Sequence, residues 1–265
     1  MSNTFDIKRF WKYLRYDLVS ALQDSGTLLV SLAAMPVWFF AVQQLLSFVF
    51  NGEFRHINTA ALIVAYIVSL TVTVIFFPVQ HYGKLTDKKA GADWILIPAS
   101  RFEKFLSMLI LCCVVAPITW FAIIAASDGL LSLVFGSYDT FVLPTIVHSM
   151  SKAVAEVHAE DVNLVFNGPV FVYLSWCQNI LAFALGAIYF RKNKIVYTFL
   201  SLIAIGMLFT MITAAVFGGE AHIGPEDISE ARIMRALNFG ICALYVFIFA
   251  VLDLGLYFRI KTIKQ

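Results

Sequence analysis

The sequence predicts an all-α polytopic membrane protein with six transmembrane helices, an N-terminal amphipathic elbow helix and both termini in the cytoplasm. Hydrophobic residues make up 60% of the 265 residues and charged residues only 14%, whereas soluble domains are about 45–50% apolar and about 25% charged. The mean hydropathy is +0.83, and the apolar residues fall into runs long enough to cross a bilayer. We expect one membrane domain over residues 1–265.

The first predicted element is an amphipathic helix over residues 5–24. Helical spacing places seven apolar side chains within an arc of about 120°. They are Ile7, Phe10, Trp11, Leu14, Leu18, Ala21 and Leu22. The remaining surface carries Lys8, Arg9, Lys12, Arg15 and Tyr16. This pattern favours a helix in the membrane interface with its basic side toward anionic lipid headgroups; a helix that packs on a protein partner is the alternative.

Six apolar runs follow, each about 20–25 residues long and therefore able to cross about 30 Å of hydrocarbon. They are residues 26–50, 59–79, 105–127, 168–190, 195–217 and 236–258. Pro36 predicts a kink in the first of them. We interpret residues 128–167 as an external segment that is folded, interfacial or re-entrant. On the fourth run, Ala182 and Gly186 have a spacing that suits close helix packing, within the fold or between subunits.

The distribution of positive charge predicts the orientation. Fifteen of the 19 Lys and Arg residues fall on one side of the predicted topology: in residues 5–24, 80–104, 191–194 and the C-terminal tail. Because cytoplasmic loops of membrane proteins are enriched in Lys and Arg, both termini are expected in the cytoplasm. A crossing within residues 128–167 would place the later basic turns outside, and we reject it.

Catalytic and cofactor-binding motifs are absent from the sequence. The five His residues are scattered, the Cys residues lie in apolar runs without metal-ligand spacing, and no phosphate-binding loop occurs. We therefore expect no enzyme activity, no metal, no cofactor and no nucleic-acid partner. Asp253 lies within the sixth apolar run and is a candidate intramembrane polar site. A structural pairing with Arg259 or a neighbouring polar group, or a role in ion coupling, would each explain it.

The longest charged interruption in the first half of the chain is residues 80–104, which we predict to be a structured cytoplasmic loop. Gly83 and Gly91 bracket a short polar helix, an apolar stretch follows, and Pro98 then breaks the chain. Ser100 and Glu103 have the spacing of a capping box at the start of the next helix. The candidate residues for docking a partner are Lys84, Asp87, Lys88, Lys89, Asp93, Trp94 and Ile95.

The order of these elements resembles the permease subunits of ABC-2-type transporters. Residues 96–105 read LIPASRFEKF, which is similar to an LPASxxEKF signature in small ABC-2-like membrane proteins of Bacteroidetes-type bacteria. The long external segment differs in place, since it follows the third span and the family's external hairpin usually follows the fifth. The resemblance implies an export permease that docks an ATP-binding cassette subunit through residues 80–104. It also implies a homodimer, or pairing with a similar permease, among the lipids of a bacterial cytoplasmic (inner) membrane.

A second class of protein also fits the sequence. A non-transporting membrane scaffold, sensor or accessory subunit would act through the external residues 128–167 instead of the cytoplasmic loop. The two hypotheses therefore place function on opposite sides of the membrane.

Overall fold

The computed structural model describes residues 5–52, 59–86, 91, 94, 96–134, 168–217 and 230–262, and these residues form helices and turns without a strand. The long helices, in chain order, are α1 (Ile7–Asp24), α2 (Gly26–Asn51), α3 (Thr59–Tyr82), α5 (Arg101–Ile110), α6 (Ala116–Val134), α8 (Gly168–Tyr189), α9 (Lys194–Phe217) and α10 (Glu230–Thr262). A 3-10 turn, η1 (Gly83–Thr86), follows α3, and a π-helical turn, η2 (Leu111–Val115), joins α5 to α6. The all-helical prediction is confirmed for these residues.

Five helices in the described part of the chain are long and apolar enough to cross a membrane. They are Gly26–Phe50, Val64–Thr86, Arg101–Val134, Val172–Tyr189 and Ala243–Thr262. The described apolar part of α9, Lys194–Leu208, is shorter. The chain is therefore a multi-pass membrane protein by length and composition, and six spans with cytoplasmic termini stay predictions.

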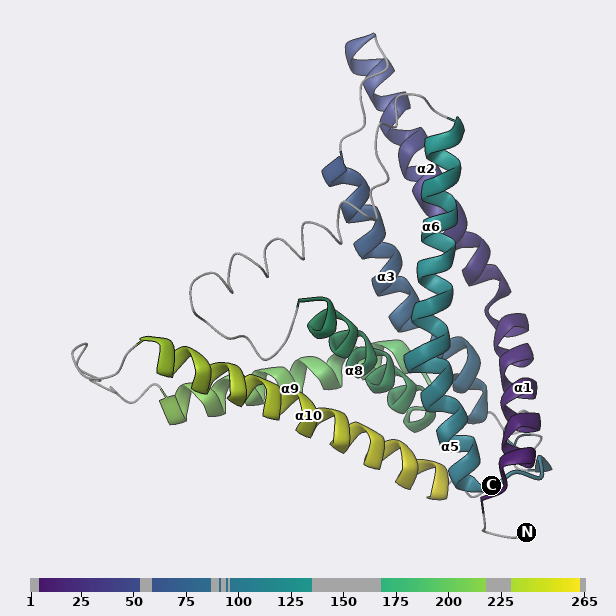
Figure 1. Cartoon of the computed structure of the whole chain (residues 1–265), viewed down its shortest axis with the longest axis vertical. Coiled ribbons are helices and arrows are strands. Elements are labelled where there is room, and N and C mark those ends of the chain that lie inside the picture. Colours follow the sequence, from purple (N-terminus) through teal and green to yellow (C-terminus); the bar gives the residue numbers. More distant parts are fainter. Residues whose placement is uncertain are drawn as a thin grey trace.

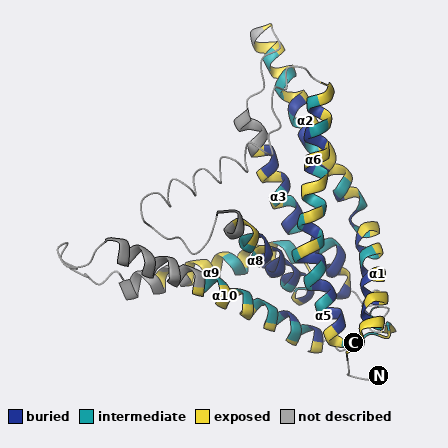
Figure 2. Cartoon of the chain, in the orientation of Figure 1, coloured by how far each residue is buried: buried dark blue, intermediate teal, exposed yellow. Residues whose placement is uncertain are grey.

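Helix α8 lies at the centre of the fold and packs against α3, α9 and α10. Its side chains Ile180, Leu181, Ala184 and Ile188 are fully buried, while the outer faces of α2, α9 and α10 are largely exposed (Figure 2). The apolar exposed faces suit contact with lipid. Figure 1 shows that the beginning of α1 and the end of α10 lie at the same end of the molecule, beside α5.

Helix α1 packs on its own chain. It continues almost directly into α2 through Ser25 and lies against α5 and α3 (Figure 1). The buried face consists of Phe10, Tyr13, Leu14, Asp17 and Ala21. The apolar arc predicted from the sequence is rotated from this face, because Ile7, Trp11 and Leu22 are exposed. The arc omitted Tyr13 and Asp17, which are polar at their tips and buried by partners on α3, α5 and the loop.

The third apolar helix extends beyond its predicted end at residue 127. α6 continues to Val134, and Asp128, which the prediction placed in the external segment, is 1% exposed. The Asp128 carboxylate accepts a hydrogen bond from the Tyr66 hydroxyl of α3 at 3.1 Å. Because the carboxylate has a buried hydrogen-bond partner, the helix can continue past it. From the sequence alone, Asp128 indicated the start of a solvent-exposed segment. The rest of residues 128–167 lies outside the described residues.

Candidate functional site

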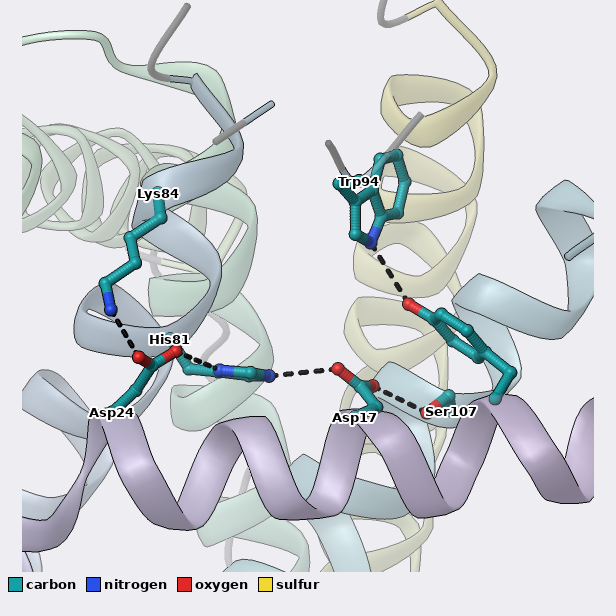
Figure 3. Close-up of polar contacts among 7 residues, drawn as sticks. Asp17, Asp24, His81, Lys84, Trp94 and Ser107 are labelled. Atoms are coloured by element: carbon teal, nitrogen blue, oxygen red, sulfur yellow. Dashed lines mark hydrogen bonds and ion pairs between the residues drawn. The ribbon is translucent and has the colours of Figure 1, made fainter. Parts of the chain in front are cut away.

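Five polar side chains from α1, α3, η1 and α5 meet beside the second half of α1. We call Asp17, Asp24, His81, Lys84 and Ser107 the elbow cluster (Figure 3). Asp17 and Asp24 are seven residues apart, which places them on the same face of α1 after two helical turns. His81 and Lys84 come from the end of α3 and from η1, and Ser107 comes from α5.

His81 lies between the two α1 carboxylates. Its Nε2 atom is 3.0 Å from Asp17 Oδ1, and its Nδ1 atom is 2.9 Å from Asp24 Oδ2. A doubly protonated ring donates a hydrogen bond from both nitrogens, whereas a neutral ring would direct a lone pair at one of the carboxylates. The geometry therefore favours an imidazolium that holds the end of α3 on α1.

Each carboxylate of the elbow cluster has a second partner. The Ser107 hydroxyl donates to Asp17 Oδ2 at 2.6 Å, and Lys84 forms an ion pair with Asp24. Burial of Asp24 would raise the pKa of its carboxyl. The hydrogen bonds and charges of Lys84 and His81 outweigh burial, so that the pKa of Asp24 is lowered from its ordinary value. Asp24 is therefore ionised at neutral pH.

Glu103 forms a second connection between α1 and α5. Its side chain is fully buried and accepts hydrogen bonds from Arg9 Nε at 2.8 Å and Arg9 Nη2 at 2.6 Å. The backbone N–H groups of Asp6 and Ser100 donate to the same carboxylate at 3.0 and 2.8 Å. The capping box predicted for Ser100 and Glu103 is present. Arg9, predicted to face lipid headgroups, instead pairs within the protein.

Trp94 lies against α1 and α5. Its indole Nε1 donates to the Tyr13 hydroxyl at 3.0 Å. The Lys104 ammonium lies 4.3 Å from the ring centroid and donates to the Trp94 carbonyl at 2.7 Å. These contacts assign Trp94 to the anchoring of the loop. Leu96, two residues further, is 73% exposed, so that among the described residues of this stretch it is an apolar side chain that a partner can reach.

A cavity of about 210 Å³ lies beside the elbow cluster. Its lining includes Tyr16, Asp17, Ser20, Asp24, His81, Tyr82, Lys84, Leu85, Trp94 and Ile97. Described residues of the loop, such as Leu85, Trp94 and Ile97, therefore line this cavity together with residues of α1. In the described part of the chain, no group of three or more His, Cys, Asp or Glu side chains could hold a metal ion.

The structure treats the remaining predicted site residues differently. Asp87, Lys88, Lys89, Asp93 and Ile95 lie outside the described residues. Pro98 lies in the non-helical residues before α5, and Lys84 is in the elbow cluster. Asp253 is half-buried in α10, and its Oδ1 atom has no hydrogen-bond partner among the described residues. Arg259 does not pair with it and instead lies 5.3 Å from the Tyr189 ring centroid.

Sequence reasoning missed Asp17, Asp24, His81 and Ser107. The seven-residue spacing of the two aspartates on an otherwise basic helix was the available signal, since buried carboxylates need positive or hydrogen-bonding partners. The partners themselves lie 57 to 90 residues away in sequence. No family model, curated protein or solved structure matches the chain.

Proposed function

We propose that the protein is the membrane subunit of an ABC-type export system, which docks a separate ATP-binding subunit through residues 80–104. The resemblance of residues 96–105 to the ABC-2 signature motivates this proposal. In it, both termini and the loop lie in the cytoplasm, and the partner subunit hydrolyses ATP. A homodimer, or a pair with a similar permease, forms the complete transporter in the bacterial inner membrane.

One observation carries the proposal: charged and hydrogen-bonded contacts join the loop to α1, α5 and α9. Lys84 binds Asp24 of α1, Trp94 binds Tyr13 of α1 and Lys104 of α5. Lys194 at the start of α9 also donates to the Gly83 carbonyl. A force applied to this loop would therefore reach α1, α5 and α9 together, which is the property that a coupling element requires.

The exposed Leu96 side chain provides a test that does not disturb these internal contacts. A tagged full-length protein is purified from its native membranes in a mild detergent, and the co-purifying proteins are identified and assayed for ATP hydrolysis. We expect a stoichiometric P-loop ATPase with the wild-type chain and its loss with Leu96→Asp. Trp94→Phe keeps an aromatic ring but lacks the indole N–H, and should retain the ATPase.

The controls separate docking from folding. Leu96→Asp must elute as a single species and unfold at the wild-type temperature, because its side chain has few contacts to lose. Absence of an ATPase from wild-type preparations that keep other membrane complexes intact would overturn the proposal. It would direct attention to the scaffold or sensor hypothesis and to residues 128–167.

A further inference from the structure

A second hollow lies between α8, α9 and α10, and none of the elbow-cluster residues line it. It is an apolar groove of about 470 Å³, within the range of about 300–1,000 Å³ that is common for small-ligand sites. Its lining includes Leu185, Gly186, Leu202, Leu252, Gly255 and Arg259. Among the described residues of the lining, the one cation is Arg259, near the end of α10.

Arg259 has no acidic partner among the described residues. None of the ion pairs there includes it, and its Nε atom is buried without a hydrogen-bond partner. Its guanidinium lies 5.3 Å from the centroid of the Tyr189 ring. The guanidinium contacts this ring, but its buried Nε atom has lost water without gaining a hydrogen bond. The partner that the site lacks is therefore a negatively charged acceptor.

The surroundings add positive charge. Arg191 and Lys192 follow Tyr189 in the turn between α8 and α9, and Lys261 follows Arg259; all three are exposed. Residues 186–202 and 254–262 contain no Asp or Glu. The groove is therefore apolar along most of its lining and strongly basic at one end.

The position of that basic end matches a lipid headgroup. Tyr189 and Arg259 lie at the ends of two apolar stretches that are able to cross a membrane, Val172–Tyr189 and Ala243–Thr262. Aromatic and basic side chains at such positions lie at the level of the headgroups, and basic pockets between membrane helices bind anionic headgroups.

We propose that this groove binds an anionic phospholipid, with its phosphate on Arg259 and an acyl chain along Leu185, Leu202 and Leu252. The apolar length of the groove favours a lipid over a free anion, and the unpaired arginine favours an anionic over a zwitterionic headgroup. The inference does not depend on the transport proposal, because lipid retention is measured without any partner subunit.

The test uses the full-length protein in nanodiscs of phosphatidylcholine that contain added phosphatidylglycerol. After transfer to detergent, the retained lipids are counted by native mass spectrometry. We expect the wild type to retain phosphatidylglycerol in preference to phosphatidylcholine, and Arg259→Gln to retain it about tenfold less. Arg15→Gln removes an exposed charge from α1, outside the groove lining, and should bind within about twofold of the wild type.

A second variant tests the acyl-chain part of the groove. A Cβ atom at Gly255 would lie 3.4 Å from Leu185, an ordinary contact, so Gly255→Leu should fold and obstruct the groove. It should reduce phosphatidylglycerol retention while Arg259 is still present. If Arg259→Gln does not fold, Arg259→Lys replaces it in the test. This variant keeps the positive charge, so it should retain more phosphatidylglycerol than Gly255→Leu does.

Three results would overturn the proposal. Equal retention of the two lipids by the wild type would remove the charge preference. Unchanged retention by Arg259→Gln would remove the assigned residue. Wild-type retention by Gly255→Leu, together with displacement of the lipid by inorganic phosphate, would show a site for a free anion only.

Discussion

Gly186 of α8 lies against Thr198 of α9 with no space for a side chain between them. A Cβ atom at residue 186 would lie 1.9 Å from Thr198 Oγ1, and the Thr198 hydroxyl is held by a hydrogen bond to the Lys194 carbonyl at 2.6 Å. The small-residue spacing of Ala182 and Gly186 thus serves packing within the fold at this position.

Gly186→Ala should therefore separate α8 from α9. We expect a loss of about 1–3 kcal/mol, the usual result of overpacking, measured as a lower unfolding temperature in detergent. Gly206→Ala is the matched control on α9, because a Cβ atom there meets nothing within 4 Å and alanine favours helix by up to about 1 kcal/mol. Adding Thr198→Ala to Gly186→Ala should restore part of the loss; no restoration would contradict the assigned contact.

Removal of Asp17 should destabilise the elbow cluster. Asp17→Ala leaves the Nε2 atom of the buried His81 and the hydroxyl of Ser107 without their Asp17 partner, although His81 keeps its contact with Asp24. Breaking a buried ion pair in this way costs about 3–5 kcal/mol. Thermal unfolding in detergent measures the change. Arg15→Ala, at an exposed position on α1, should stay within about 0.5 kcal/mol of the wild type. Additive effects of Asp17→Ala and His81→Ala in a double-mutant cycle would show that the two side chains do not interact.

Glu103→Gln tests the second connection between α1 and α5. The NH₂ group of the glutamine amide would face the N–H donors of Arg9 and the backbone. Hydrogen bonds to the charged carboxylate, worth about 1.5–3 kcal/mol each, would therefore be weakened. We expect lower stability and faster proteolytic cleavage within α1. Arg101→Gln is the exposed neighbouring control. Cleavage of α1 at the wild-type rate would place its attachment elsewhere.

The stability of the elbow cluster should depend on acidic pH through Asp24. Because the pKa of Asp24 is lower in the folded state than its ordinary value of 3.8, the ionised carboxylate stabilises the folded state above that value. This stabilisation is lost as the pH falls through the lowered pKa. Unfolding temperatures measured from about pH 6 to pH 3 should fall more steeply for the wild type than for Asp24→Asn. Parallel curves would contradict the assignment.

Local and compositional features could be predicted from the sequence, and long-range polar partners could not. The apolar runs predict the membrane helices because hydrocarbon excludes charge, and the capping box is set by residues three apart. Trp94 carried no local sign that its indole N–H bonds Tyr13, 81 residues away. Arg9 and Asp128 were assigned by their charge to headgroups and to solvent, because their buried partners, Glu103 and Tyr66, lie on other helices.

The attachment of α1 also has a consequence for synthesis of the chain. Its contacts to α5 join residues 90 and 94 positions apart, Asp17 with Ser107 and Arg9 with Glu103. While a ribosome makes α2 and α3, these partners do not yet exist, and the charged groups of α1 must be hydrated by water or headgroups. The elbow can therefore close only after α5 has emerged, so that a nascent chain arrested before residue 100 would expose α1 to protease and a chain arrested well beyond residue 110 would protect it.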